Sequence, residues 1–177
     1  MQKAMLDALV EEATRKSGLI WVGIADQPAR AVWHVWNDGG AYLVVGGGVQ
    51  ELPGIDAVST VTVSVRSKDK GGRLVTWTAR PRVVVPDGQE WTTVVAMLHA
   101  QRLNPPDGEQ QPKRWRRSSV VYRLEPTGLV AERPGSMPTE SQAAAPLGSP
   151  ATTRGRLPFV IGKATGRKRA KSAPPAT

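Results

Sequence analysis

Apolar residues recur with a helical spacing in two parts of the chain. Near the N-terminus they repeat every three or four positions, at Met5, Leu6, Leu9, Val10 and Ala13. This spacing predicts a helix over residues 2–16. A second helix is expected over residues 88–103, with Asp87 as its N-cap and Glu90 as the partner in a capping box. Each helix should bury one apolar face against a core.

Six further segments carry the short apolar runs or the alternation that is typical of strands. The alternation is clearest where Val61, Val63 and Val65 are separated by polar residues, because a period of two places them on one face. The expected strands cover residues 19–24, 31–36, 41–45, 59–66, 73–80 and 119–124. Turns at Asn37–Gly40 and Asp69–Gly72 are typical of hairpins, since Asp and Gly accept a positive φ.

This pattern predicts one mainly β domain of the α+β class over residues 1–126. The first four strands are expected to be sequential neighbours, in a small antiparallel barrel whose openings are covered by the two helices. The second strand should place Val32, His34 and Trp36 on one face. We interpret His34 as a half-buried histidine bonded to the backbone, since no carboxylate or second histidine is placed to support catalysis.

Composition changes after Thr127, where the sequence becomes rich in Pro, Ala, Ser, Thr and Gly and loses its periodicity. Such a segment buries too little apolar area to offset chain entropy, so we expect a disordered, basic tail over residues 127–177. The tail carries much of the formal net charge of +9. Its cations could contact a polyanion non-specifically through counterion release, although a solubilising tail without a partner explains the same composition.

Several classes of chemistry are excluded by the composition. The chain has no cysteine, which rules out disulfides, thiolate metal sites and cysteine nucleophiles and fits a reducing compartment. No zinc-protease, nucleophile-elbow or phosphate-loop motif is found, so no catalytic or metal-ligating residue is assigned. Charge follows the first residues too early for a secretory signal, and no apolar run approaches the ~20 residues that span a bilayer. We therefore expect a cytoplasmic protein without a membrane segment.

One hairpin concentrates positive charge. Arg66, Lys68, Lys70 and Arg73 lie within eight residues around the hydroxyl of Ser67. Like charges at this spacing repel one another, so a bound phosphate or carboxylate would relieve that cost. The strand that follows leads to Trp77, which could offer a flat apolar surface to a ring. A solvated turn whose lysines protect strand edges is the alternative interpretation.

A second cationic group, residues 113–117, precedes the last strand. It alternates Lys and Arg with Trp115 and could clamp a phosphate, a carboxylate or RNA. A polar loop anchored by Trp115 is the interpretation that we favour.

The order of these elements resembles that of a known family. A helix and a strand are followed by a strand beginning Arg30-Ala-Val-Trp-His-Val-Trp, a hairpin, the run Tyr42-Leu-Val-Val, and a Val/Thr strand with a long hairpin partner. This order resembles the FMN-binding split barrels, which include the pyridoxamine 5′-phosphate oxidases and their flavin- or deazaflavin-dependent relatives. Over residues 1–126, the resemblance implies a six-stranded Greek-key barrel that forms a homodimer and holds its cofactor in a groove shared by two protomers.

The resemblance also implies where FMN or a deazaflavin would bind. Arg30 and Val32 match the start of the family's Arg-x-Val-x-Leu-Lys strand, and Val35 stands at the position of its Lys. The family's Ser-x-Lys phosphate motif is replaced by Gly46–Glu51. Two usual phosphate ligands are thus missing: either Arg66, Lys68 and Arg73 replace them, or the cofactor is bound differently, or it is not bound at all. The full set expected to contact the cofactor is Arg30, Val32, Arg66, Ser67, Lys68, Arg73 and Trp77.

Two functional hypotheses follow. The first is a flavin-dependent oxidoreductase of unknown substrate, in which the cofactor supplies the redox chemistry and no side chain has to be a strong acid or base. The second, motivated by the missing lysines, is a cofactor-free split barrel that serves as a binding or interaction module.

Overall fold

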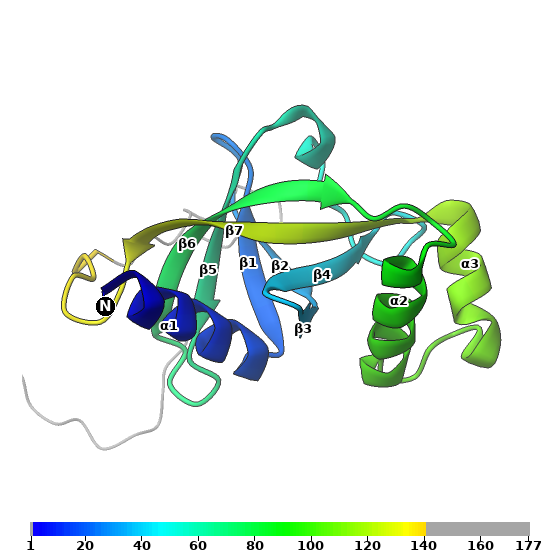
Figure 1. Ribbon diagram of the computed structural model, residues 1–177, viewed down its shortest axis with the longest axis horizontal. Coiled ribbons are helices and arrows are strands. Elements are labelled where there is room, and N and C mark those ends of the chain that lie inside the picture. Colours follow the sequence, from blue (N-terminus) through cyan, green and yellow to red (C-terminus); the bar gives the residue numbers. More distant parts are fainter. Residues whose placement is uncertain (1, 141–177) are drawn as a thin grey trace, which may run out of the picture. The chain divides into compact units, whose positions relative to one another are not determined.

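The computed structural model describes residues 2–140, which lie within one compact unit, Met1–Gln142. These residues form a mainly β structure with three α-helices (Figure 1). The part of the predicted tail from residue 141 onward lies outside the described residues. Among the described residues, no helix combines the length and hydropathy needed to cross a membrane.

The helices and strands follow the sequence prediction closely, with two additions. The helices are α1 (Gln2–Lys16), α2 (Gln89–Gln101) and α3 (Gln111–Ser118), with short 3₁₀ turns η1 (Ile55–Ala57) and η2 (Gly108–Gln110). The strands are β1 (Leu19–Gly23), β2 (Arg30–Trp33), β3 (Val35–Asn37), β4 (Gly40–Val45), β5 (Val61–Arg66), β6 (Arg73–Val83) and β7 (Val120–Glu132). The six strands and two helices that were predicted are therefore seven strands and three α-helices.

All seven strands pair antiparallel in one curled sheet, in the order β2-β1-β5-β6-β7-β4-β3. The extra strand arises because His34 divides the predicted second strand into β2 and β3. Strands β2 and β3 lie at opposite ends of the strand order, although only His34 separates them along the chain. The sheet must therefore curl until its two end strands come close together. The third and fourth predicted strands, residues 41–45 and 59–66, correspond to β4 and β5. They were expected to be neighbours, and this prediction is wrong, since β4 pairs with β3 and β7 while β5 pairs with β1 and β6.

Each face of the sheet carries its own hydrophobic core. The inner cluster contains the alternating residues Val61, Val63 and Val65 of β5, together with apolar residues of β1, β6 and α1. The outer cluster packs α2 and α3 against β3 and β4. Val32 and Trp36 belong with the first cluster and Trp33 and Val35 with the second, which confirms the predicted faces of this segment. Figure 1 shows α2 and α3 side by side at one end of the sheet, away from α1.

Two prolines lie inside strands, and both positions explain why they are tolerated. Pro81 pairs with Leu124 of β7 but lies beyond the last residue of β6 that pairs with β5, so its missing N–H breaks no ladder. Pro126 faces Ala79 next to a register shift between β6 and β7. Strand β7 thus continues to Glu132, and the domain boundary placed at residue 126 is too early.

Three glycines, Gly46, Gly47 and Gly48, follow β4; we call them the glycine loop. The loop packs closely against Ser118 and Ser119, just before β7. At Gly47 φ is +62°, and an added Cβ would lie 2.4 Å from Ser119 Oγ and 2.7 Å from the Ser118 carbonyl oxygen. Just beyond the loop, Gln50 uses both ends of its side-chain amide on one residue. It accepts from the Trp33 N–H at 3.1 Å and donates to the Trp33 carbonyl at 3.1 Å.

Candidate functional site

A cavity of about 640 Å³ opens beside the β5–β6 hairpin; we call it the hairpin cavity. Its walls come from the end of α1, from β1, from the hairpin and from the last residue of α2. Among residues 2–140, four basic side chains and no acidic one line it: Arg15, Lys16, Arg66 and Lys68. The volume is within the range of about 300–1,000 Å³ that is usual for cofactor pockets.

The hairpin presents its cations on a tightly bonded turn. Ser67 donates its N–H to the Gly72 carbonyl at 2.7 Å, and its own carbonyl accepts from Gly71 N–H at 2.9 Å. The Ser67 hydroxyl accepts from the Lys70 N–H at 3.3 Å. Arg66 Nε donates to the Gly71 carbonyl at 2.7 Å, which leaves its other guanidinium donors available. Three of the predicted residues, Arg66, Ser67 and Lys68, are therefore brought together.

Helix α1 contributes two cations that the sequence analysis missed. Arg15 and Lys16 occupy its last turn, where positive charge complements the helix dipole. Both pair with Glu12 on the helix surface, and these hydrogen bonds, from Lys16 first, lower the pKa of the Glu12 carboxyl. Two adjacent cations at the end of the first predicted helix were visible in the sequence, but their proximity to residue 66 depends on the tertiary fold.

The apolar part of the hairpin cavity is provided by β1. Leu19 is 44% exposed at the start of this strand, and Trp21 is half-buried. The Arg66 guanidinium lies 5.1 Å from the centroid of the Trp21 ring, in a cation–π contact. The cavity thus combines an apolar wall with cations, a combination that suits a ring system carrying a phosphate.

The remaining predicted residues lie elsewhere. Trp77 is 1% exposed and packs edge-on against Trp36 in the inner cluster, so its ring is not available to a ligand, and Val32 is also 1% exposed. Arg73 points toward the segment after β7, where it donates to the carbonyls of Pro138 and Glu140. Arg30 is exposed at the start of β2, outside the residues that line the cavity.

The second cationic group is helical, whereas a loop was predicted. Trp115 anchors α3 in the outer cluster at 1% exposure, which leaves no aromatic face for a nucleotide base. Arg114 bonds Asp107 at 3.0 Å and the Gly47 carbonyl at 2.9 Å. Arg116 pairs with Asp87, which was predicted to cap α2. The role of Trp115 as an anchor is confirmed.

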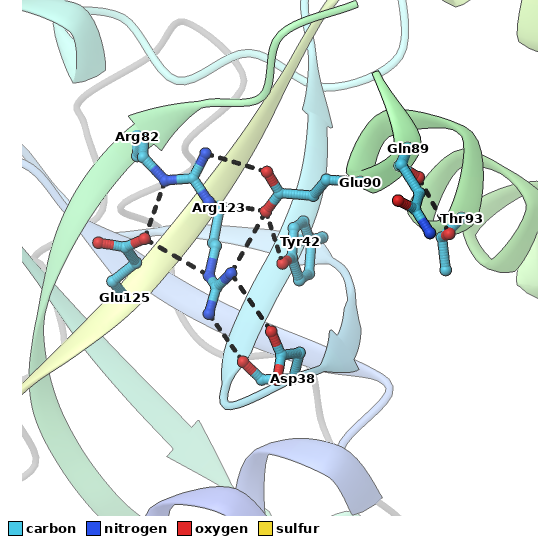
Figure 2. Close-up of polar contacts among 8 residues, drawn as sticks. All are labelled: Asp38, Tyr42, Arg82, Gln89, Glu90, Thr93, Arg123 and Glu125. Atoms are coloured by element: carbon cyan, nitrogen blue, oxygen red, sulfur yellow. Dashed lines mark hydrogen bonds and ion pairs between the residues drawn. The ribbon is translucent and has the colours of Figure 1, made fainter. Parts of the chain in front are cut away.

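A network of charged residues ties α2 to the sheet (Figure 2). Glu90 of α2 accepts from Arg82 of β6 at 2.7 and 3.1 Å, from Arg123 of β7 at 3.3 Å and from the Tyr42 hydroxyl at 2.8 Å. Glu125 accepts from Arg82 Nε at 2.8 Å. We call this set, with Asp38 beside Arg123, the Glu90 network. The Glu90 side chain therefore bonds residues of the sheet, and the predicted capping box at the start of α2 is not formed.

The Glu90 network has strongly shifted ionisation. The hydrogen bonds from Arg82, with those from Tyr42 and Arg123, lower the pKa of Glu90 to about 2. Burial, followed by the hydrogen bond to Glu90, raises the pKa of Tyr42 to about 12. Since both cations and both glutamates are already paired, we interpret the network as a structural fastening of α2 and not as an acid–base centre.

His34 is buried between β2 and β3, with 5% exposure. Its Nε2 donates to the Thr14 carbonyl of α1 at 2.9 Å, which confirms the predicted backbone bond. Burial lowers the pKa of His34, so the neutral imidazole is favoured. Within the described part of the chain, no group of three or more His, Asp or Glu side chains is placed to hold a metal ion.

Comparison with known proteins identifies the fold. No protein-family model and no curated protein sequence matches the chain. Among solved structures, HutZ, the heme storage protein from Vibrio cholerae, has a TM-score of 0.51 at 14% identity, over 68% of this chain and 89% of HutZ.

Two further structures are similar at lower scores. One is a protein from Clostridium acetobutylicum related to general stress protein 26, of the pyridoxinephosphate oxidase family, with a TM-score of 0.45 at 11% identity over 69% of this chain and 84% of that one. The other is a conserved hypothetical protein from Mycobacterium tuberculosis, with a TM-score of 0.48 at 17% identity over 72% and 81%. The similarity to HutZ is one of fold.

Proposed function

We propose that the protein binds a phosphorylated flavin, FMN or a deazaflavin, in the hairpin cavity and acts as an oxidoreductase. The observation that supports this most directly is the set of cations around the cavity, with Trp21 and Leu19 on its wall. Arg66, Lys68 and the Ser67 hydroxyl offer the charged and neutral donors that a phosphate accepts. The bound flavin would supply the hydride chemistry, while the protein positions its ring and phosphate.

In the resembled family a Ser-x-Lys motif binds the phosphate, and residues Gly46–Glu51 stand at that place in this chain. This segment suits a phosphate less well than the hairpin cavity does. Glu51 and Asp56 line a separate cavity beside Gly46, together with Arg117, so a phosphate there would face two carboxylates and one cation. The donor set therefore fits an anion at the β5–β6 hairpin better than at the glycine loop. The dimer that the resemblance implies stays a prediction.

Titration of the full chain with FMN and with a deazaflavin tests the proposal. Arg66→Ala or Lys68→Ala should weaken binding about 10- to 100-fold, because each removes a charge-assisted contact worth about 1.5–3 kcal/mol. Lys70→Ala is the matched control, since Lys70 belongs to the same hairpin but does not line the cavity. Flavin fluorescence gives the dissociation constants.

A second candidate function is a cofactor-free binding module. Two residues expected to contact the cofactor favour this function. Trp77 is buried in the inner cluster, and Arg73 already donates to a backbone carbonyl of the protein. If neither flavin binds below the millimolar range, or if all three variants bind as the native chain does, the cofactor proposal is wrong and the binding module is the better description.

A further inference from the structure

The hairpin cavity contains one neutral polar side chain whose hydrogen-bonding atoms are free. Among the described residues, the amide and hydroxyl side chains that line it are Ser17, Ser67 and Gln101. The Ser17 hydroxyl donates to the Leu19 carbonyl, and the Ser67 hydroxyl accepts from the Lys70 N–H at 3.3 Å. The exposed Gln101 side chain has no hydrogen-bond partner among residues 2–140, so its amide is available to a ligand as donor and acceptor.

Gln101 supplies the cavity with a free acceptor. The four cations that line it can only donate, and so can the indole N–H of Trp21. These donors suit an anion, but a ring N–H that enters the cavity needs an acceptor, since a donor left unpaired costs binding free energy. The two serine hydroxyls are already engaged in the turns of the protein, within the part of the chain that the structure describes. A ligand N–H is therefore expected to face the Gln101 carbonyl.

The cationic hairpin and the end of α2 lie on opposite sides of β1, which is placed between β5 and β2 in the sheet. On the β5 side, the Arg66 guanidinium lies 5.1 Å from the centroid of the Trp21 ring. On the β2 side, Arg102, which follows Gln101, lies 5.3 Å from the centroid of the Trp33 ring. Because neighbouring strands are about 4.8 Å apart, β5 and β2 are separated by about 10 Å across β1.

The groups of the cavity thus follow one another in a fixed order. Cations at the hairpin come first, the apolar wall of Leu19 and Trp21 is next, and the free amide of Gln101 is last. A flavin phosphate carries matching groups: a phosphate, a tricyclic ring, and an imide edge in which one N–H lies between two carbonyls. A primary amide complements such an edge, because its NH₂ donates to a carbonyl while its oxygen accepts from the N–H.

We propose that Gln101 binds the imide edge of the ring, so that the hairpin cavity selects phosphorylated heterocycles with an unsubstituted N–H between two carbonyls. The inference rests on the proposed flavin binding, since the hairpin must hold the phosphate for the ring to reach α2. FMN and a deazaflavin both carry this edge, so Gln101 accepts either. A ring that is methylated at the imide nitrogen is rejected, because it leaves the Gln101 carbonyl without its donor.

Titrations of the full chain with FMN, and with FMN methylated at the imide nitrogen, test the ligand side of the proposal. The methyl group removes one N–H and keeps the phosphate and the ring. We expect the methylated ligand to bind about tenfold more weakly, measured by flavin fluorescence. Equal binding of the two ligands would overturn the role of Gln101 and leave flavin binding in place, whereas absence of binding by both would overturn both proposals.

A substitution tests the protein side. Gln101→Ala should weaken FMN about tenfold and bring the dissociation constants of FMN and its methylated form together, because the acceptor that distinguishes them is gone. Gln89→Ala is the matched control, since Gln89 is exposed at the other end of α2 and does not line the cavity. It should keep the native preference for FMN. A Gln101→Ala chain that keeps this preference, or a Gln89→Ala chain that loses it, would contradict the assignment.

Discussion

Glu90 connects one helix to three strands, β4, β6 and β7, through a single carboxylate. Its four hydrogen bonds come from Arg82, Arg123 and Tyr42, and the side chain is 34% exposed. Removing a charge from such a set leaves the partner cations with fewer acceptors, which costs more than losing a pair on an open surface. The polar part of the attachment of α2 to the sheet is therefore concentrated in Glu90, beside the apolar packing of the outer cluster.

The first prediction at this scale concerns Glu90→Gln. We expect a loss of about 1–2 kcal/mol in the free energy of unfolding at pH 7, after allowance for the partial exposure of the side chain. Denaturant unfolding of the native and variant chains measures the difference. Glu109→Gln, on the exposed turn η2, should change the free energy of unfolding by less than about 0.5 kcal/mol.

The same residue predicts a dependence of stability on pH. Folding lowers the pKa of Glu90 from 4.5 to about 2, so its contribution is complete above pH 4.5 and is lost as the pH falls toward 2. The stability difference between the native chain and Glu90→Gln should therefore shrink between pH 5 and pH 2. A constant difference across this range would contradict the assigned role of the Glu90 carboxylate.

At the scale of elements, the strands were predictable and α3 was not. Strand β5 was predictable because its apolar residues alternate with polar ones around Val63, and the apolar face is the one buried in the core. Helix α3 contains a single large apolar residue, Trp115, among polar and basic neighbours, so it shows no apolar periodicity. Its position depends on contacts distant in sequence, such as Arg114 with the Gly47 carbonyl. The cavities likewise form only when such elements meet.

The contact between the glycine loop and the start of β7 gives a prediction at this scale. Gly47→Ala should destabilise the protein by about 2–4 kcal/mol, because it adds strain at a positive φ and a clash with the Ser118 carbonyl. Gly39→Ala is the matched control. Its φ is +70° but no atom lies within 4 Å of the added Cβ, so only the strain of about 1–2 kcal/mol applies. Equal losses in thermal unfolding would show that the clash is relieved without cost.

For the whole molecule, the extent of the domain is the main correction to the sequence prediction. The sequence predicts a last strand over residues 119–124 and a domain that ends at residue 126, where the composition changes. The register shift beside Ala79 accommodates Pro126, and β7 continues along β6. Beyond the proline, Val130 pairs with Trp77, and Glu132 accepts from the Thr76 hydroxyl at 2.7 Å. The composition of the segment did not reveal this pairing.

Two truncations test the boundary. A chain ending at Gln142 should keep a cooperative melting transition, because it retains the whole of the first compact unit. A chain ending at Pro126 should melt at a lower temperature, because it loses the second half of β7 and exposes the strand it covered. Calorimetry of the two truncated chains and the full chain compares them. Identical transitions in all three would place the boundary at Pro126 after all.

The bond pair between Gln50 and Trp33 has a consequence for self-association. Strand β2 is an end strand of the sheet, and an end strand with free backbone groups is a template on which another chain can add by edge-to-edge pairing. The Gln50 amide occupies both backbone groups of Trp33 as a neighbouring strand would. The side chain thus acts as a one-residue substitute strand, and an incoming polypeptide cannot pair with the backbone of Trp33 without displacing it.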